Sequence, residues 1–556
     1  MNKYKNNKKG FTIVELVIVI AVIAILSAVL IPTISGLIKK ANVTADQTLV
    51  RNLNTSLAIA SDGKDGKSTM YETLKDIEDQ GYVVSRLTPT SAGSDIVWDS
   101  EKNQFVLVME NGKYYTGTTY EDYSEDDYYK LWKIYDNTNV SDSKYSVYLS
   151  SEKGEVTGEV TVNGVGFDAG DNTGITKVTY NGNDVSRDVV IRTNGGELVV
   201  NDTNSNNQQK HYGYADKVEV TTGTSCYHEY GNVDILVAKV GNVIAESGSK
   251  VSVAVSQTSA TIETKENATI ETKQENVSEE NTNKLLNATA VVGVTAYDSL
   301  ETAITGASAG DTVKLLKDIS SSTTINIDKE LILDGNGHKL TTSVETTSIM
   351  VVSGTGDFTL KNLTVYASKE IKEAKYGGTN ADILLKTTGK VVIEGCTFDG
   401  ISKAYYNVIE FGQDTVVKDG TSFINNTFVG TSMRHNAINI FTEEENSTIY
   451  LTGNSFIDLL TSNTNAIRIS DYTDAAVTFE IKDNIYSYVA ASNDTIYDGF
   501  ALIQQNKGGI ANISLHFKNL LVNGKVATSN NQETHNQVYY IFSNKVFYDG
   551  LKEVTF

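Results

Sequence analysis

A single carboxylate, Glu15, interrupts the apolar stretch that runs from Phe11 to Ile38. A carboxylate at the centre of a membrane helix costs roughly 2.5–3.5 kcal/mol on insertion scales, so such a residue needs a partner. The residues before the stretch are rich in lysine, which keeps them in the cytoplasm and places everything after Ile38 outside the cell. The chain therefore opens with a membrane segment whose one charge must be neutralised.

The block Lys8 to Leu16, Lys-Lys-Gly-Phe-Thr-Ile-Val-Glu-Leu, closely resembles the processing site of type IV prepilins. The resemblance implies cleavage after Gly10 and N-methylation of Phe11, with a prepilin peptidase and methyltransferase as partners. It also implies that the Glu15 carboxylate of one subunit meets the Phe11 ammonium of a neighbouring pilin subunit during assembly. Such opposite charges attract strongly in a low-dielectric bundle and can set the axial register between subunits.

Two other kinds of N-terminal segment, a secretory signal peptide and an ordinary membrane anchor, fit these residues less well. A secretory signal peptide has an apolar core of about 7–15 residues followed by its cleavage site, whereas this stretch is about twice as long and the expected cut precedes it. An ordinary membrane anchor fits the length but gives no reason for Gly10-Phe11 or for Glu15. The prepilin interpretation explains all three residues.

Metal and thiol chemistry have little support in the sequence. Cys226 and Cys396 fall in what are expected to be different domains, and they do not show the ligand spacing of a zinc site. His211, His228 and Glu229 suggest a metal site only weakly, because they lack a helical or hairpin ligand spacing. We expect no metal, no cofactor and no disulfide between the two cysteines.

Length and charge restrict the remaining possibilities. With 556 residues the chain should form several domains. Its net charge of −22 opposes binding to nucleic acid, since phosphate contacts need clustered lysine and arginine. An exported protein of this size with two cysteines fits the surface of a Gram-positive cell.

Hydrophobic periodicity predicts a pilin-like α+β head over residues 41–150. Leu49, Leu53 and Leu57 form a helical stripe beyond the membrane segment, and a short second helix is expected over 68–80. The apolar runs 96–98 and 105–108 flank a polar turn and predict a hairpin. A long helix on a small antiparallel sheet is typical of pilins and pseudopilins.

The next two segments differ in composition. Residues 151–255 are rich in Val, Thr, Gly and Asn, and their alternation predicts a β-rich module of strands with one buried face. Residues 256–290 carry a near-duplication, Ala-Thr-Ile-Glu-Thr-Lys at 260–265 and again at 268–273. The duplication allows a last strand pair, but the polar run after it favours a mobile linker.

A repeat of 29 residues marks the C-terminal segment 291–556. Motifs of the form Asn-x-Ile begin at Asn407, Asn436 and Asn465, and a companion motif ends in an aromatic residue at Phe398, Phe428 and Phe456. Short strands repeated at this period indicate a solenoid. The pattern resembles the right-handed parallel β-helix of pectin-lyase-like proteins, and a helix near 299–307 resembles the N-terminal cap of that fold.

The parity of the repeat assigns its two faces. Ile409, Ile438 and Ile467 should form the core, with the three Asn-x-Ile asparagines stacked as a ladder on the same side. Residues of the opposite parity should point outward and stack between coils, where with nearby polar and aromatic residues they could bind a glycan; a solvated, salt-bridged face is the favoured alternative. This candidate patch comprises Tyr405, Tyr406, Glu410, Arg434, His435, Asn439 and Arg468.

An enzyme is the less favoured interpretation of the C-terminal segment. Glycoside hydrolysis needs paired carboxylates at a fixed separation. Neither the Asp-Asp nor the Gly-His-Gly arrangement of polygalacturonases occurs, and Asp334-Gly335-Asn336-Gly337-His338 is expected to be a turn. We predict no enzymatic activity; the alternative is a membrane-anchored surface polysaccharide lyase or hydrolase.

The sequence thus predicts a multidomain, single-pass membrane protein. Its expected parts are a leader (1–10), a transmembrane assembly helix (11–40), the pilin-like head, the β-rich module, the linker and the β-helix. The expected function is that of a type IV pilus or pseudopilus subunit precursor, a minor or tip pilin with an adhesive head at the cell surface. Its expected partners are the processing enzyme, other pilins, the assembly machinery and the membrane.

Substitutions at Gly10 and Glu15 test the prepilin interpretation. Replacing Gly10 with valine should leave the leader attached, and replacing Glu15 with valine should prevent incorporation into filaments without blocking cleavage. Electrophoretic mobility reports cleavage, and the amount of chain in sheared filaments reports incorporation. If both variants matched the wild type in cleavage and in incorporation, a plain membrane anchor would explain the N-terminus instead.

Overall fold

The computed structural model divides into two compact units. Unit 1 comprises Met1–Val251 and Thr258–Ile270, and unit 2 comprises Ser252–Gln257 and Glu271–Phe556. The helix expected over 68–80 lies outside the described residues. The structure describes residues 12–60, 87–109, 113–122, 130–135, 140, 145–150, 155–163, 166–182, 188–201, 207–222, 226–344, 348–368, 381–400, 407–412, 415, 417–429, 436–442, 447–460, 465–471, 477–489, 501–506, 513–518, 521–522, 525–526, 542–543 and 546–547.

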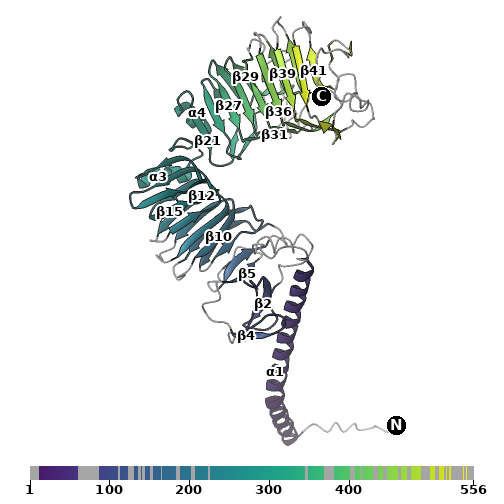
Figure 1. Ribbon diagram of the computed structural model, residues 1–556. Helices are drawn as coiled ribbons and strands as arrows, with labels where there is room; N and C mark the ends of the chain where they lie inside the picture. The colour runs from purple at the N-terminus through teal and green to yellow at the C-terminus, as the bar shows by residue number, and fades with distance from the viewer. Residues whose placement is uncertain are drawn as a thin grey trace, which may run out of the picture. The chain divides into compact units, whose positions relative to one another are not determined.

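Unit 1 begins with one long helix, α1 (Ile13–Ala60), drawn in purple in Figure 1. Its N-terminal part is apolar on all sides, and the large side chains from Ile13 to Ile38 are exposed. By length and composition the helix can cross a membrane, with a mean hydropathy of 3.1 in its most apolar window. Pro32 lies inside it.

The second half of α1 packs on a small sheet, as the leucine stripe predicted. Val50 and Leu57 are buried against Trp98 and Phe105, whose rings meet edge to face at 5.1 Å. The expected hairpin is present, with Trp98 paired to Phe105 in antiparallel register. The strands of this head are β1 (Asp95–Asp99), β2 (Gln104–Val108), β3 (Lys113–Tyr115), β4 (Tyr120–Asp122) and β5 (Leu131–Tyr135).

Polar side chains of α1 fix the helix to the rest of the head. The Asn54 amide donates to the Phe105 carbonyl at 2.8 Å and accepts from the Phe105 amide at 2.7 Å, as a neighbouring strand would. The buried Asp46 carboxylate accepts from the backbone N–H groups of Thr90 and Ser91 at 2.7 and 2.8 Å. These bonds satisfy backbone groups that burial would otherwise leave without water.

The rest of unit 1 is a parallel array with two strands per repeat. After β5, which pairs with β6 in parallel, the chain alternates between two columns of strands. The first column contains β6 (Ser146–Leu149), β8 (Phe167–Asp168), β10 (Val189–Asn194), the start of β12 (Gln208–Thr222), β13 (Cys226–Glu229), β15 (Gly241–Ala245) and β17 (Ala260–Thr264). The second contains β7 (Gly158–Asn163), β9 (Ile175–Asn181), β11 (Glu197–Asn201), the end of β12 and β14 (Asn232–Ala238).

We call one passage through both columns a coil, and the whole arrangement the two-strand coil array. Residues that pair across neighbouring coils are between 16 and 24 positions apart. Asparagines line one edge: Asn181 donates to Asn163 at 3.0 Å, and Asn201 donates to Asn181 at 3.2 Å. The sequence predicted strands with one buried face here but not their parallel, repeated stacking.

Residues 256–290 are folded, contrary to the linker expectation. The near-duplicated sequence forms two strands, β17 and β18 (Thr269–Gln274), which follow β16 (Lys250–Ser256). This agrees with the alternative to a linker, in which the duplication forms two further strands. The polar run forms α3 (Glu279–Asn287), whose N-terminus is capped by the Ser278 hydroxyl and which buries Leu285. Backbone pairing of the strands, together with a capped helix that is anchored by one buried leucine, suffices to order a segment with few apolar residues.

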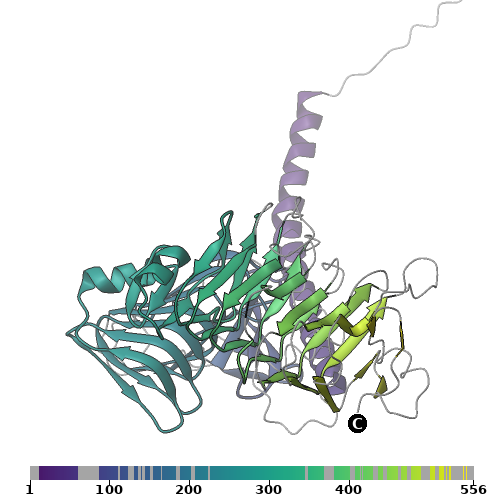
Figure 2. The same cartoon turned by 90° about the horizontal axis from the view of Figure 1, so that it is seen from above.

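Unit 2 is built from three sheets that the chain visits in turn, one strand in each, and we call it the three-strand coil array. All ladders between successive coils are parallel. Seen from above, its strands follow one another in chain order from teal to yellow (Figure 2). It opens with β19 (Ala290–Val292), β20 (Thr295–Tyr297) and α4 (Leu300–Gly306), the expected cap helix, which begins at a capping box formed by Ser299 and Thr302.

The three sheets have the following strands. The first contains β21 (Thr312–Leu315), β24 (Leu331–Asp334), β27 (Phe358–Lys361), β30 (Val391–Glu394), β33 (Ser422–Ile424), β36 (Ser447–Thr452), β39 (Val477–Lys482) and β42 (Ile513–Lys518). The second contains β22 (Ile319–Ser321), β25 (Lys339–Thr342), β28 (Thr364–Ala367), β31 (Thr397–Gly400), β34 (Thr427–Val429), β37 (Ser455–Leu460), β40 (Ile485–Val489), β43 (Leu521–Val522) and β44 (Lys525–Val526). The third contains β23 (Ile325–Ile327), β26 (Met350–Gly354), β29 (Ala381–Thr387), β32 (Asn407–Phe411), β35 (Asn436–Thr442), β38 (Asn465–Asp471) and β41 (Ala501–Asn506). A short hairpin, β45 (Phe542–Ser543) and β46 (Val546–Phe547), lies near the end of the chain.

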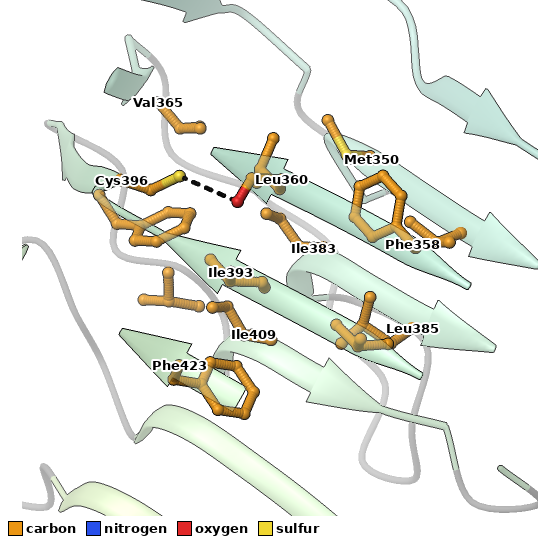
Figure 3. Packing of buried hydrophobic residues seen from close by; sticks show 14 of the residues in the cluster. Met350, Phe358, Leu360, Val365, Ile383, Leu385, Ile393, Cys396, Ile409 and Phe423 are labelled. Carbon is orange, nitrogen blue, oxygen red and sulfur yellow. Dashed lines mark hydrogen bonds between the residues drawn. The ribbon is translucent and has the colours of Figure 1, made fainter. Parts of the chain in front are cut away.

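The core of unit 2 is the face that the repeat predicted. Ile409, Ile438 and Ile467 are in register on adjacent strands of the third sheet and are fully buried. Figure 3 shows how side chains of all three sheets converge, with the Cys396 thiol directed at the Leu360 carbonyl. The aromatic residues of the companion motif form a continuous stack with centroid separations of 5.0–5.1 Å: Phe398, Phe428, Phe456 and Tyr486.

A ladder of buried asparagines stands beside this aromatic stack. Asn454 accepts from the Asn426 backbone and side-chain amides, both at 3.0 Å, and donates to Asn484 at 3.1 Å. Its amide also donates to the Phe423 carbonyl at 2.9 Å. Each asparagine thus supplies hydrogen-bond partners to the backbone of the preceding coil, and the ladder sets the register of adjacent coils.

Removing one member of this ladder should destabilise unit 2. Asn454→Ala leaves buried donors and acceptors without partners, which should cost about 3 kcal/mol in the free energy of unfolding. Hydrogen exchange of the β34 and β37 amides in the intact chain measures the loss. The matched control is Asn326→Ala on the exposed part of β23, which should change stability by less than about 0.5 kcal/mol. Equal protection in both variants would contradict the role of the ladder.

Candidate assembly site and ligand patch

Glu15 forms a reciprocal cap with Thr12 at the start of α1. The Glu15 carboxylate accepts from the Thr12 backbone N–H at 2.9 Å and from the Thr12 hydroxyl at 2.8 Å. The Glu15 N–H donates to the Thr12 hydroxyl oxygen at 3.2 Å. This is a capping box, which satisfies backbone donors that have no partner within the helix. The spacing Thr-x-x-Glu carries this signal, but the sequence analysis assigned Glu15 to assembly alone.

The cap gives Glu15 hydrogen bonds but no opposite charge. Within residues 12–60, no side-chain ion pair to Glu15 is found, so its partners in the single chain are the two Thr12 groups. Gly10 and Phe11 lie outside the described residues. The neutralising cation that the sequence analysis expected therefore stays a prediction.

The described members of the ligand patch lie in one column of the third sheet. Glu410 pairs with Asn439, and Asn439 pairs with Arg468, on successive parallel strands. The predicted stacking between coils is therefore present. The other four members of the patch, Tyr405, Tyr406, Arg434 and His435, lie outside the described residues.

The outer face of the third sheet is buried rather than solvated on β32 and β35, where the described patch residues Glu410 and Asn439 lie. Glu410 and Asn439 expose only 4% and 2% of their surface, and the neighbouring Val408 and Ala437 are also buried. The expected open face is therefore wrong for these two polar residues. Strand parity distinguishes the two sides of a sheet but does not show which of them is covered.

Hydrogen bonds partly compensate the burial of Glu410. Its carboxylate accepts from the Asn407 amide at 2.8 Å, and Asn407 in turn accepts from Asn436 at 2.5 Å. The predicted asparagine ladder is therefore confirmed between Asn407 and Asn436, while the Asn465 side chain lies outside the description. Burial raises the pKa of Glu410, opposed by the Asn407 hydrogen bond and by the charge of Arg468.

A second carboxyl group, Asp382, lies on the same outer face. It exposes 8% of its surface, and burial raises its pKa to about 7. Within the described part of the chain, the Asp382 Oδ1, Asn439 Oδ1 and Arg468 Nε atoms are buried without a hydrogen-bond partner. A protonated carboxyl group beside a carboxylate is an arrangement that glycosidases use. Here both groups are almost inaccessible, which disfavours contact with a polysaccharide substrate.

The residues considered for a metal site are engaged in hydrogen bonds instead. The two ring nitrogens of His211 contact Glu229 at 2.9 Å and Thr193 at 2.7 Å. His228 contacts the Glu246 carboxylate at 2.6 Å through Nδ1. Cys226 and Cys396 are both free thiols.

Two family models match separate parts of this chain. Residues 5–31 match the model of the prokaryotic N-terminal methylation motif, and residues 291–405 match that of a pectate lyase-like adhesive domain. The fimbrial protein of Moraxella nonliquefaciens is 42% identical over 67 residues, which cover 11% of this chain and 44% of that protein. The type IV wide pilus major component PilA4 of Thermus thermophilus is 63% identical over 38 residues, 7% of this chain and 29% of that protein.

These matches confirm the resemblance that the sequence suggested. The N-terminal segment is therefore similar to that of type IV pilins, and residues 291–405 are similar to a pectate lyase-like adhesive domain. The chain spans less than half the length of either pilin relative. No solved structure matches it.

The buried Asp382 should make the stability of unit 2 depend on pH. Its pKa is raised from about 3.9 in the unfolded chain to about 7, so the folded state holds the proton more tightly and stability falls as pH rises between these values. Unit 2 should be about 3 kcal/mol less stable at pH 8 than at pH 5. Asp382→Asn should reduce this difference strongly, with the remainder coming from Glu410, whose pKa burial also raises, whereas Asp328→Asn at an exposed position should leave it unchanged. Denaturant titrations of the intact chain at the two pH values check this, and an equal pH dependence in Asp382→Asn and the wild type would contradict it.

Proposed function

We propose that this chain is a type IV pilus or pseudopilus subunit precursor that displays an adhesive domain at the cell surface. The observation that carries the proposal is the methylation motif, which runs into an apolar helix whose side chains the chain itself leaves exposed. An apolar helix of this kind lies in lipid before assembly and against neighbouring helices afterwards. The adhesive-domain match at 291–405 supports the second half of the proposal.

We propose a minor or tip position in the filament. About 400 residues follow the pilin-like head, in the two coil arrays. A fibre made of this chain alone would have to place that bulk at every subunit. A position at the tip, or at sparse points along the fibre, avoids the crowding.

The remaining details of the sequence interpretation are part of this proposal. The leader would be cut after Gly10, Phe11 would be methylated, and Glu15 would pair with the new ammonium of a neighbour. The body would lie outside the cell, at a Gram-positive surface, with the domain boundaries given above except for the folded segment 256–290. We also propose that the three-strand coil array is a right-handed parallel β-helix, since parallel crossovers are right-handed in about 98% of cases.

A glycan is the ligand class that we propose for the adhesive domain. The four patch residues outside the described ranges are aromatic or cationic, types that contact sugars by stacking and hydrogen bonding. The alternative is a surface polysaccharide lyase or hydrolase, for which the Asp382 and Glu410 carboxyl groups are the candidates. Their burial is the reason that we prefer adhesion.

Immunogold labelling tests the position and the assembly route together. Antibodies to residues 291–556 should label filament tips or sparse points, and the Glu15→Val variant should lose that label while keeping a membrane-bound pool. Continuous labelling along the fibre would indicate a major pilin. Surface labelling without filaments, equal in both strains, would indicate a plain membrane anchor.

Binding and turnover assays on the intact, detergent-solubilised chain separate adhesion from catalysis. A glycan array should show binding that is weakened by Tyr405→Ala or Arg434→Ala. Release of reducing ends or unsaturated products from acidic and neutral polysaccharides would favour the enzyme, above all if Asp382→Asn abolished it.

A further inference from the structure

The two-strand coil array is connected in series. Each strand of a column bonds to the strand one coil before and one coil after it, as in the run β8, β10, β12 and β13. The chain enters the array beside β6 and passes through the coils in order to β17. Repeat arrays of this kind are stabilised by nearest-neighbour contacts. Tension applied between the two ends is therefore carried by every coil-to-coil junction in turn.

The direction of the hydrogen bonds decides how such a junction fails. Ladder bonds run across the strands, from one coil to the next, and hence along the line in which the coils are stacked. A pull along that line opens a junction bond by bond, starting from an end of the array. Most coils have 16–20 residues, and such a coil extends to about 60 Å when it is released, compared with about 4.8 Å when it is stacked.

Two successive junctions of the array are reinforced by a fully buried relay. Thr193 on β10, His211 on β12 and Glu229 on β13 lie on three consecutive coils, with 0–1% of their surfaces exposed. The Thr193 hydroxyl lies 2.7 Å from His211 Nε2, and His211 Nδ1 lies 2.9 Å from both Glu229 oxygens. The relay therefore links three coils through side chains as well as through their backbones.

Hydrogen-bond partners account for both ring nitrogens of His211. The Thr193 hydroxyl has one hydrogen, which it donates to the Tyr214 carbonyl at 2.6 Å, so His211 Nε2 is the donor in the contact with Thr193. His211 Nδ1 faces a Glu229 carboxyl group that also accepts from the Tyr227 hydroxyl and the Gly231 N–H, both at 2.7 Å. The relay is therefore satisfied entirely by groups of neighbouring coils, and removing one member leaves buried polar atoms without partners.

The other polar links in the same coils are more exposed. Lys210, the neighbour of His211, bonds Asp188 at 2.9 Å with side-chain exposures of 28% and 49%. Lys217 bonds Glu197 at 3.1 Å, also at the surface. Exposed ion pairs contribute little because water screens them. The relay is therefore the most deeply buried of these three links between coils.

We propose that the two-strand coil array is an extensible tether, whose coils detach one at a time under tension, and that the Thr193–His211–Glu229 relay is the latch that detaches last. The source of the tension rests on the proposed function, since an adhesive domain held by a ligand and anchored through a filament is pulled at both ends. Stepwise detachment lengthens the link and lowers the peak force on the adhesive contact. The relay keeps a central group of coils folded, from which the detached coils can restack.

Single-molecule pulling on the intact chain tests the tether. Thr157 and Glu266 are exposed positions near the two ends of the array and serve as attachment points as Thr157→Cys and Glu266→Cys, with Cys226→Ser and Cys396→Ala removing the native thiols. The expected record is a series of steps, each releasing about 60 Å of chain, with refolding in steps when the force is lowered. A single event that released the whole segment, about 380 Å, would overturn the tether.

Relay variants test the latch in the same instrument. Thr193→Val and Glu229→Gln are nearly isosteric, and either should raise the rate of the last step at fixed force by at least about tenfold. Lys210→Gln, on the outer face of the same strand, is the matched control and should leave that rate within about twofold. Equal effects of the relay and control variants would overturn the latch. A relay variant that lost the stepwise record altogether would support it, provided that Lys210→Gln kept the steps.

This experiment is independent of the filament proposal. It needs neither processing at Gly10 nor a glycan, so a chain that detaches stepwise but is absent from filaments would refute the proposed function and leave the tether standing. Conversely, a chain that is found in filaments but ruptures in one event would leave the proposed function standing and refute the tether.

Discussion

A polar group withdrawn from water needs a hydrogen-bond partner, and in much of this protein a neighbouring turn or coil of the same chain meets this constraint. At the start of α1 it is met one turn away, where Glu15 and Thr12 cap each other. In unit 2 it is met one coil away, by Asn426, Asn454 and Asn484. In unit 1 the buried His211 is satisfied from the coils on both sides.

The same constraint explains why parallel coils suit a long surface protein. Each coil presents to the next the same positions of the strand, so an asparagine, an aromatic ring or an ion pair can be repeated without a new solution each time. The stack from Phe398 to Tyr486 and the Asn454 ladder lie side by side for this reason. Length is then added by repetition, and stability is divided among junctions between neighbours.

Features that depend on local periodicity could be predicted from the sequence. The leucine stripe of α1, the hairpin around Trp98, the cap helix after Ser299 and the buried isoleucines of the 29-residue repeat all follow from patterns within one element or one fixed spacing. The two-strand coil array was missed because its coils vary between 16 and 24 residues, which removes the fixed period. The fold of 256–290 was missed because its order comes from backbone pairing and capping rather than from apolar side chains.

The candidate sites, too, could be predicted from the sequence only in part. The methylation motif is a contiguous string, so the sequence alone showed the motif, while the roles of Gly10, Phe11 and Glu15 stay predictions. The ligand patch was assigned by parity, which placed Glu410, Asn439 and Arg468 in one column correctly but gave no information on the burial of that face. Asp382 and the His211 relay depend on residues one coil apart, which only the register brings together.

Within residues 12–60, the partner found for Glu15 is Thr12, which leaves the charge of the carboxylate uncompensated, and the account requires that a neighbouring subunit supply the cation. Mass spectrometry of the N-terminal peptide from chains in sheared surface filaments tests this requirement most directly. The account predicts a peptide that begins at Phe11 and carries one additional methyl group on its amino nitrogen. Filament-associated chains that still carried residues 1–10 would contradict it, because no new ammonium would then exist to meet the carboxylate.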